Sequence, residues 1–408
     1  MKSVKYTCYI NINLLSLLAI FINNHIMEWI GRYYEGEFEN LLQRNKVLVL
    51  HGSRQVGKTS LVKKLIKPGK EVFTGDGNDL DLQDTLNSQR LSVIQNALGG
   101  YRLIFIDEAQ KVVRIGEAIK LLIDNVPDIT IILTGSSSFH LQGKLGEPLT
   151  GRQNAYLLFP LSILEMVNHT GRMNVLRTVD NLLVFGSYPE VYTASNNDGR
   201  IKYLHNLRNS YLLKDILELE NIRNTSKLFD ILRLLAFQIG MEVSLNELSK
   251  QLGIAKQTVE RYLELLEKVF IIKKVQGFSR NLRKEITKTH RYYFWDNGVR
   301  NSIINNFNPL KMRNDTGMLW ENFLFTERLK TQEYLGIHSN NFFWRTYDQK
   351  EVDMVEERGG KLFGYEFKLK AKTFKAPRLW TETYKNAKFK VVDRENFLDF
   401  LLDREMND

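Results

Sequence analysis

The sequence has little cysteine: Cys8 is the only one among 408 residues. One thiol excludes a disulfide framework and any cysteine-rich metal site, and it is typical of a reducing compartment. The apolar run LLSLLAIFI, residues 14–22, is too short to span a bilayer. With 43% hydrophobic and 25% charged residues, the composition is that of an ordinary globular protein. At this length we expect two or three domains, each with its own core.

Residues 1–26 imitate a secretory signal, because Lys2 and Lys5 precede the apolar run. No small-residue cleavage site follows, and Met27 stands directly before the start of an expected globular region. We expect residues 1–26 to come from an upstream start codon and to contribute little to the fold. A membrane anchor is the alternative, but we expect a cytoplasmic protein.

A phosphate-binding loop is expected within VLVLHGSRQVGKTSLVKKLI, residues 47–66, where an apolar strand leads through G-x-x-x-x-G-K-T into a helix. The glycines let successive N–H groups surround a β-phosphate. Lys58 would reach the β- and γ-phosphates, and the Thr59 hydroxyl would bind Mg²⁺. We therefore expect ATP and Mg²⁺ as cofactors. The expected nucleotide-binding residues are Gly52, Ser53, Arg54, Gln55, Val56, Gly57, Lys58, Thr59 and Ser60.

A second nucleotide motif is YRLIFIDEAQ, residues 101–110, a buried strand of a parallel sheet that ends in two acids. We expect Asp107 to hold Mg²⁺ through water and Glu108 to activate the attacking water. Residues 71–76 predict a further strand. The strand at residues 129–138 ends in hydroxyl residues, of which Thr134 or Ser136 would sense the γ-phosphate or simply form a turn.

Arg152 follows a glycine in a polar loop before another apolar strand. It would reach the nucleotide of its own or of a neighbouring subunit as an arginine finger, or form a surface salt bridge. In the first case it hints at a homo-oligomer. In FGSYPEVY, residues 185–192, Gly186 and Pro189 are expected to fix the entry to a helix.

Residues 243–275 predict a helix-turn-helix followed by a strand. Ser244 and Glu247 form a capping box, and Gly253 lies in the turn. The strand and residues 291–296 would pair as the wing of a winged helix. Winged helices also dock proteins or pack internally, so a protein partner stays an alternative to DNA.

Basic residues exceed acidic ones in this region, in keeping with the net charge of +10 and the pI of about 9.3 of the whole chain. Residues 250–291 contain eleven Lys or Arg against four Glu. Such a patch suits nucleic-acid phosphates, DNA more than RNA, with Lys256, Gln257 and Thr258 near base edges. The residues placed in or beside the wing loop are Arg280, Arg283, Lys284, Lys288 and Arg291.

A hairpin about Gly359-Gly360 is predicted within EVDMVEERGGKLFGYEFK, residues 351–368, with paired positions that sum to 719. Glu351, Asp353, Glu366 and Lys368 would then project from one face. The other face would carry Val352, Met354, Tyr365 and Phe367. The charged face is either a solvated edge or a metal site.

A helix at residues 317–330 that carries Glu321 on its more polar side precedes this hairpin, and the layout resembles PD-(D/E)xK nucleases. Asp353 and Glu366, with help from Glu321, would bind Mg²⁺ and polarise a scissile phosphate. Lys368 would position water or stabilise developing charge. The basic residues Lys370, Lys372, Lys375 and Arg378 would hold a phosphate backbone, but a half-buried structural ribbon is the alternative.

From about Met27 on, the chain resembles a bacterial and archaeal group of AAA+-superfamily ATPases that end in domain of unknown function 4143. The motifs that carry this resemblance are HGSRQVGKTS, IFIDEAQ, ILTGSSS, LTGR, LFPLS, FGSYPEVY and the hairpin. The resemblance implies an α/β P-loop ATPase core at 27–165, a helical lid and connector at 166–235, a winged helix at 236–300, and an α/β nuclease-like domain at 301–408. It implies no biological role.

Overall fold

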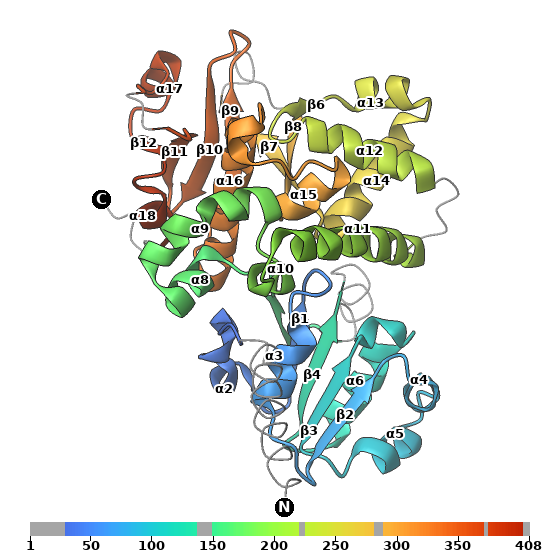
Figure 1. Ribbon diagram of the computed structural model, residues 1–408. Coiled ribbons are helices and arrows are strands. Elements are labelled where there is room, and N and C mark those ends of the chain that lie inside the picture. The colour runs from blue at the N-terminus through green and yellow to red at the C-terminus, as the bar shows by residue number, and fades with distance from the viewer. Residues whose placement is uncertain (1–28, 137–148, 220–224, 281–288, 371–373, 403–408) are drawn as a thin grey trace, which may run out of the picture.

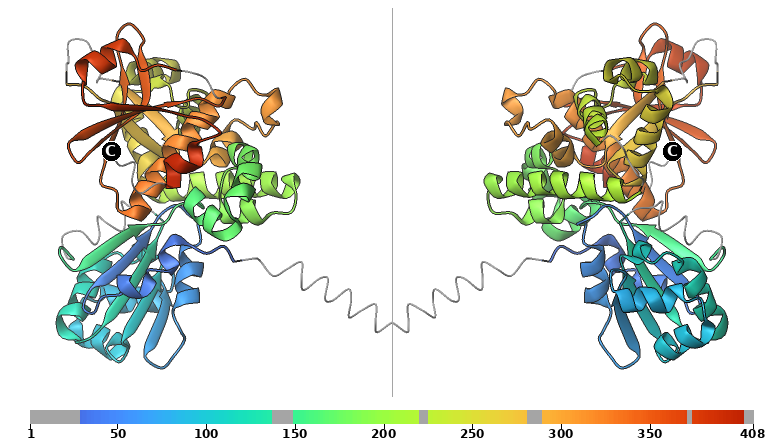
Figure 2. Two further views of the ribbon diagram at one scale, coloured as in Figure 1. Left: turned by 90° about the vertical axis from the view of Figure 1, so that its left-hand side faces the viewer. Right: turned by 90° about the vertical axis from the view of Figure 1, so that its right-hand side faces the viewer.

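The structure is a computed structural model that describes residues 29–136, 149–219, 225–280, 289–370 and 374–402. The apolar extension at residues 1–26 and the basic residues Arg283, Lys284, Lys288 and Lys372 lie outside the described residues. The chain forms two lobes: the lower lobe of Figure 1 contains the first sheet with its helices, and the upper lobe contains the elements from α8 onward. The side views of Figure 2 show the same division.

The lower lobe contains an all-parallel sheet with the strand order β2-β3-β4-β1-β5. Its strands are β1 (Val47–His51), β2 (Val72–Asp76), β3 (Leu103–Asp107), β4 (Thr130–Gly135) and β5 (Gln153–Leu157). Its helices are η1 (Tyr33–Glu35), α2 (Phe38–Leu41), α3 (Lys58–Leu65), α4 (Leu80–Asn87), α5 (Leu91–Leu98), η2 (Ala109–Lys111) and α6 (Ile115–Asn125). This is a P-loop NTPase fold, as the motifs predicted.

Helices cover both faces of this sheet, which explains its nearly continuous apolar strands. Alternate residues of β1 point to opposite sides: Leu48 and Leu50 pack with α3, whereas Val47 and Val49 pack with α4, α5 and α6. The carboxyl ends of the strands therefore meet at one edge of a rigid, doubly covered layer.

Helices connect the two lobes: α8 (Ile163–Thr170), α9 (Arg172–Phe185), α10 (Pro189–Thr193), α11 (Asn197–Leu219) and α12 (Thr225–Phe237). Pro189 is the first residue of α10, and Gly186 has a φ of 76°, as expected for the FGSYPEVY turn. Asp296 accepts hydrogen bonds from the backbone N–H groups of Ser187 and Val299, so this turn is fixed to the upper lobe.

The upper lobe is built on one seven-stranded sheet with the order β12-β11-β10-β9-β7-β8-β6. Its elements are β6 (Glu242–Val243), α13 (Leu245–Leu252), α14 (Lys256–Lys268), β7 (Ile272–Gly277), β8 (His290–Phe294), α15 (Asn297–Ile303), η3 (Leu310–Met312), α16 (Thr316–Leu335), β9 (Asn340–Arg345), β10 (Glu351–Arg358), β11 (Lys361–Phe367), α17 (Arg378–Thr383), β12 (Lys388–Val392) and α18 (Phe397–Leu402).

The helix-turn-helix segment folds at the predicted positions. Ser244 caps α13 through the N–H of Glu247, and Gly253 adopts φ 64° in the turn before α14. Strands β7 and β8 pair, but β7 also joins β9 through parallel pairs at Gln276–Phe342 and Gly277–Phe343. One sheet therefore crosses the boundary predicted at residue 300.

Gly186 is a position where only glycine fits, because φ is 76° and an added Cβ would overlap the Asp296 carboxylate. We predict that Gly186→Ala lowers the free energy of unfolding by at least about 2 kcal/mol, measured by chemical denaturation. The matched control is Gly317→Ala in α16, where a Cβ would meet nothing within 4 Å. Equal stability of the two variants would contradict this account of the turn.

Candidate functional site

The predicted phosphate-binding loop wraps between β1 and α3 with unusual backbone angles. Gly52 and Gly57 have φ of 141° and 93°, and Gln55 has a φ of 60°. A Cβ at Gly52 would overlap the carbonyl of Leu158, so the close approach of the loop to the strand exit requires glycine. The loop leads directly into the amino terminus of α3, where N–H groups are available for an anion.

The structure brings together the two motifs that the sequence places 48 residues apart. The Thr59 hydroxyl donates a hydrogen bond to the Asp107 carboxylate at 2.8 Å. Thr134, at the end of the intervening strand β4, donates to the other carboxylate oxygen of Asp107. Lys58 is buried and donates to the carbonyls of Gly52 and Ser53 at 2.9 and 2.7 Å. Three oxygen-bearing side chains and one lysine therefore converge at this edge.

Glu108 lies next to Asp107 and adopts a left-handed backbone conformation, with φ 47°. Such strain in a non-glycine residue is concentrated at functional sites. Gln110 donates hydrogen bonds to the carboxylate of Glu108 and, at 3.2 Å, to the hydroxyl of Ser136. Gln110 was not among the predicted site residues, although it lies within the IFIDEAQ motif.

Arg152 does not lie at this edge. It immediately precedes β5, whose residue Gln153 pairs with Val47 at the amino end of β1, and its guanidinium pairs with Asp124 at 2.9 Å. Because the loop at residues 52–57 follows the opposite end of β1, Arg152 does not reach a nucleotide of its own chain. That part of the expectation is wrong, and a role in a neighbouring subunit stays a prediction.

His51, the last residue of β1, was not expected at an inter-lobe contact. Its ring lies 5.7 Å from that of Phe270, which follows α14 and has a φ of 59°. Burial and the charge of Lys58 lower the pKa of His51 to about 4. The end of β1 thus touches the upper lobe directly.

Arg32 makes a second buried contact that the sequence analysis missed, and its partner is 133 residues away. Its guanidinium pairs with Glu165 at 2.9 Å and donates to the carbonyls of Val56 and Phe159. Tyr334 of α16 accepts a hydrogen bond from the N–H of Phe159. The phosphate-binding loop and the upper lobe therefore share one buried polar network.

The carboxyl-terminal hairpin forms in the predicted register, since Met354 pairs with Tyr365 and Arg358 with Lys361. Gly359 and Gly360 both have positive φ, as a two-residue turn requires. The register shifts between Val352 and Val355 against β9. As a result, Val352 packs in the cluster of Trp344 and Trp380, whereas Met354, Tyr365 and Phe367 pack against α16 and α18. The expected single apolar face is therefore divided.

The charged residues of the hairpin do come together with Glu321, but not at a solvated edge. Asp353 and Glu366 are 5% and 2% exposed. Lys368 pairs with Glu366 at 2.5 Å, and the N–H of Phe367 donates to Asp353 at 2.8 Å. Helices cover both faces of the sheet, so Asp353 and Glu366 do not lie on a solvated face. The side chains of Glu351 and Lys368 are still 43% and 34% exposed.

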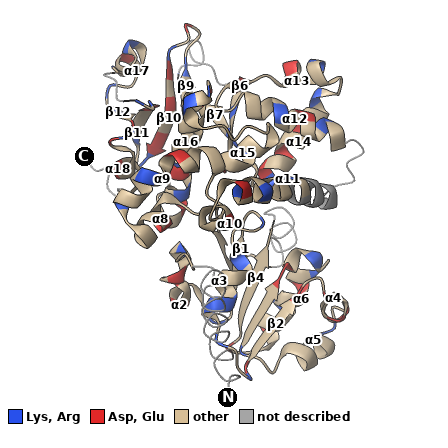
Figure 3. Cartoon of the chain, viewed as in Figure 1, with Lys and Arg blue, Asp and Glu red and all other residues tan. Residues whose placement is uncertain are grey.

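Arg291 belongs to this cluster, although the sequence analysis assigned it to the phosphate-binding wing. It is 3% exposed and pairs with Glu321 at 3.4 Å and Glu351 at 2.7 Å. A buried guanidinium does not contact a duplex, so that assignment is wrong. Figure 3 shows acidic positions on β10, beside the helix α16 that carries Glu321.

Burial is the largest cause that raises the pKa of Glu321 to about 8 and that of Glu366 to about 7, and the charge of Asp353 is the second. Burial also raises the pKa of Asp353. Four carboxylates face two cations here, and the second carboxylate oxygen of Glu366 is buried without a hydrogen-bond partner. Within the described ranges, however, no three His, Cys, Asp or Glu side chains are grouped closely enough to hold a metal ion.

Comparisons with protein families agree with the two ends of this architecture. Residues 44–167 match a model described as an AAA domain, and residues 316–402 match domain of unknown function 4143. Residues 176–310 match another domain of unknown function, numbered 8612. The chain thus carries an AAA-type ATPase domain, which suggests nucleotide binding and hydrolysis. It also carries the carboxyl-terminal domain that the motifs predicted.

Relatives occur in other organisms. An uncharacterized protein of Mycobacterium tuberculosis is 26% identical over 331 residues, which cover 80% of this chain and 71% of the relative. An uncharacterized protein of Methanocaldococcus jannaschii is 22% identical over 309 residues, which cover 66% of this chain and 63% of the relative. Neither name states an activity.

A solved structure is also similar: a signal-transduction ATPase with numerous domains and a tetratricopeptide repeat sensor from Pyrococcus horikoshii. The two chains are 13% identical, and the TM-score is 0.31. The match covers 75% of this chain and 47% of the Pyrococcus protein. At that TM-score the likeness does not bear on function. None of the described helices is long and apolar enough to cross a membrane.

The burial of His51 predicts a pH dependence of stability. Its folded pKa of about 4 lies below its ordinary value of 6.5, so stability is fully present above pH 6.5 and is lost as the pH falls toward 4. We predict that lowering the pH from 7.5 to 4.5 destabilises the wild type by up to about 3 kcal/mol more than His51→Gln. Denaturation curves at both pH values measure this difference, and parallel losses in the two proteins would contradict it.

Proposed function

We propose that the chain is a Mg²⁺-dependent ATPase whose nucleotide state controls its carboxyl-terminal half. The observation that carries the proposal is the hydrogen bond between Thr59 and Asp107, flanked by buried Lys58 and by Glu108. The single cysteine further suggests a cytoplasmic protein.

The residues at this edge suit a magnesium nucleotide. Mg²⁺ prefers oxygen ligands, and the Thr59 hydroxyl and the Asp107 carboxylate supply them within hydrogen-bonding distance of each other. When bound, the ion neutralises charge on the phosphates. Lys58 would leave its two carbonyl partners to meet the β- and γ-phosphates, because an ammonium gains more from a phosphate than from neutral carbonyls.

Glu108 is the residue proposed to orient the attacking water and polarise it toward the γ-phosphorus. Gln110 holds the Glu108 carboxylate and joins it to Ser136, which follows β4. A change at Ser136 on γ-phosphate binding would release or turn Glu108, so the two hydroxyl residues Thr134 and Ser136 fit the proposed sensing role.

Nucleotide state would reach the upper lobe through the buried contacts on either side of the loop. The guanidinium of Arg32 donates to the carbonyl of Val56, inside the loop. The same guanidinium pairs with Glu165 and hydrogen-bonds Tyr334 of the upper lobe. His51 meets Phe270 on the other side. Movement of the loop on phosphate binding would therefore be transmitted to α14 and α16 through packed side chains.

We predict that Glu108→Gln keeps ATP affinity within about threefold but lowers the turnover rate at least about a hundredfold, since the amide cannot polarise water. Binding is measured with a fluorescent ATP analogue, and turnover by phosphate release. Glu117→Gln, an exposed substitution in α6, is the control and should retain turnover. Equal turnover of Glu108→Gln and wild type would remove Glu108 from the mechanism.

A second candidate function is binding and Mg²⁺-dependent cleavage of DNA by the carboxyl-terminal half. Two observations favour it. Lys256 and Gln257 are exposed at the start of α14. Buried Asp353 lies close enough to Glu321 and Glu366 to raise the pKa of both, so a bound cation would favour their ionised forms. Asp353 and Glu366 are the proposed ligands, with Glu321 beside them and Lys368 near the phosphate. The competing proposal is a nucleotide-dependent scaffold that binds a protein partner and cleaves nothing.

Incubation of the purified chain with linear DNA, RNA and Mg²⁺ separates these two proposals. The nuclease proposal predicts cleavage that falls at least about a hundredfold in Asp353→Ala, because loss of a ligand weakens the metal site. Asp348→Ala, in the exposed turn before β10, is the matched control. Absence of cleavage with every nucleic acid and nucleotide tested would favour the scaffold.

A further inference from the structure

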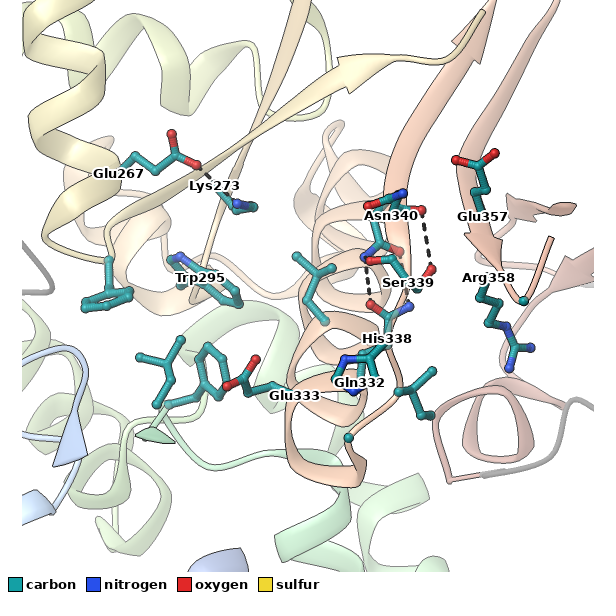
Figure 4. Close-up of a pocket in the computed structure, with 18 of the residues that line it drawn as sticks. Glu267, Lys273, Trp295, Gln332, Glu333, His338, Ser339, Asn340, Glu357 and Arg358 are labelled. Atoms are coloured by element: carbon teal, nitrogen blue, oxygen red, sulfur yellow. Dashed lines mark hydrogen bonds and ion pairs between the residues drawn. The ribbon is translucent and has the colours of Figure 1, made fainter. Parts of the chain in front are cut away.

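A cleft of about 1100 Å³ opens between the two lobes. The close-up in Figure 4 shows Glu267, Lys273 and Trp295 on one side, Gln332 and Glu333 of α16 with Asn340 across from them, and Glu357 with Arg358 beyond. This volume exceeds that of most small-molecule sites, about 300–1000 Å³. The cleft therefore suits a segment of a larger molecule.

At the base of the cleft, two neighbouring strands of the sheet, β7 and β9, diverge; this divergence is called the fork. Strand β7 pairs with β8 over five residue pairs, but with β9 over only two, Gln276–Phe342 and Gly277–Phe343. A hollow of about 280 Å³ between the diverging strands shares Lys273, Asn340 and Asn341 with the cleft. The edge of β7 from Lys273 to Val275 thus lines this hollow, and Lys273 also lines the cleft.

A side chain takes the place of a strand at this edge. The N–H of Lys274 donates to the carboxylate of Glu267 at 3.2 Å, and Lys273 pairs with the same carboxylate. An incoming extended peptide could take over such an edge N–H, as in strand addition to other sheets. Three residues of unpaired strand, Lys273 to Val275, correspond to about 10 Å, enough to pair with a short peptide.

The chemistry of the walls favours a peptide over a polyanion. The ring centroids of Phe159 and Trp295 are 4.8 Å apart. Together with Phe270, these rings provide apolar surface for the side chains of a peptide. The amides of Gln332 and Asn341 hydrogen-bond each other at 3.1 and 2.7 Å, whereas the exposed amide of Asn340 offers a donor and an acceptor to a peptide backbone. The ionised lining residues are Glu264, Glu267, Glu333 and Glu357 against Lys268, Lys273 and Arg358. Within a chain of net charge +10, a lining with four acids against three bases favours a cationic ligand over a phosphate.

We propose that the cleft binds an extended peptide segment of a protein partner, with apolar side chains and at least one Lys or Arg, as an added strand on β7. The coupling of this site to nucleotide rests on the proposed ATPase function, since Phe270 and Phe159 adjoin His51 and Arg32. Peptide binding itself does not require that function.

The test is selection of a phage-displayed library of random 12-residue peptides on the full chain without nucleotide, after depletion on Asn340→Trp. Asn340 is exposed at the start of β9 and lines both the cleft and the hollow beside β7, so the indole would obstruct the edge of β7. Met312→Trp, 77% exposed and outside the cleft lining, is the matched control. Synthetic versions of the selected peptides are titrated by fluorescence anisotropy, with a twenty-nucleotide oligothymidine in parallel.

We expect micromolar peptide affinity that falls at least tenfold in Asn340→Trp and is unchanged in Met312→Trp. Hydrogen exchange of the wild type should slow at residues 272–276, a readout that does not depend on the folding of any variant. The proposal is overturned if no peptide binds, if peptides protect other segments, or if the oligonucleotide protects residues 272–276 instead. A chain without ATPase activity can still pass this test, and an active ATPase can still fail it.

Discussion

The buried guanidinium of Arg32 is the constraint on which the arrangement of both lobes depends. A charge removed from water requires a partner, and Glu165 supplies it at 2.9 Å. The same guanidinium binds carbonyls of the phosphate-binding loop and of the β5 exit, so the loop, the sheet edge and α8 are held in one geometry. Glu165 also completes the capping box with Ser162 at the start of α8. Tyr334 then extends this network to α16, the helix that carries Glu321.

The nucleotide-binding lobe could be predicted from sequence because its information is local. Glycines at 52 and 57, the lysine and threonine that follow, and an apolar strand ending in Asp107 each have a physical reason at their own position. The parallel sheet then brings the strand ends together without further instruction. The hairpin of β10 and β11 was predictable for the same reason, since a Gly-Gly turn fixes the register.

The remaining features depend on contacts between distant residues, which no local pattern encodes. Arg32 and Glu165 are 133 positions apart, and nothing near either one predicts the other. From the sequence, Arg291 was assigned to an exposed wing. It lies on β8, an inner strand of the seven-stranded sheet, where its side chain pairs with Glu321 and Glu351. The bulge between Val352 and Val355 has no signal in its residue types. Arg152 shows a different error, because strand direction alone places it far from the loop.

The two lobes meet where the chemistry of one can influence the other. The loop that would hold phosphates touches Phe270 through His51, and the interlobe cleft lies on the other side of that contact. A nucleotide-dependent change there would alter the cleft and the fork between β7 and β9. The acidic cluster around Asp353 is farther along the same sheet, joined to the cleft through β9 and β10. This layout suits a switch in which ATP governs what the upper lobe binds.

The central claim is that the loop and the end of β3 converge on one magnesium nucleotide. Calorimetric titration of ATP into the wild type and into Asp107→Asn, each with Mg²⁺ and with EDTA, tests it most directly. The account predicts that Mg²⁺ strengthens ATP binding at least tenfold in the wild type and has little effect in Asp107→Asn. An equal dependence on Mg²⁺ in both proteins, or no ATP binding by the wild type, would contradict it.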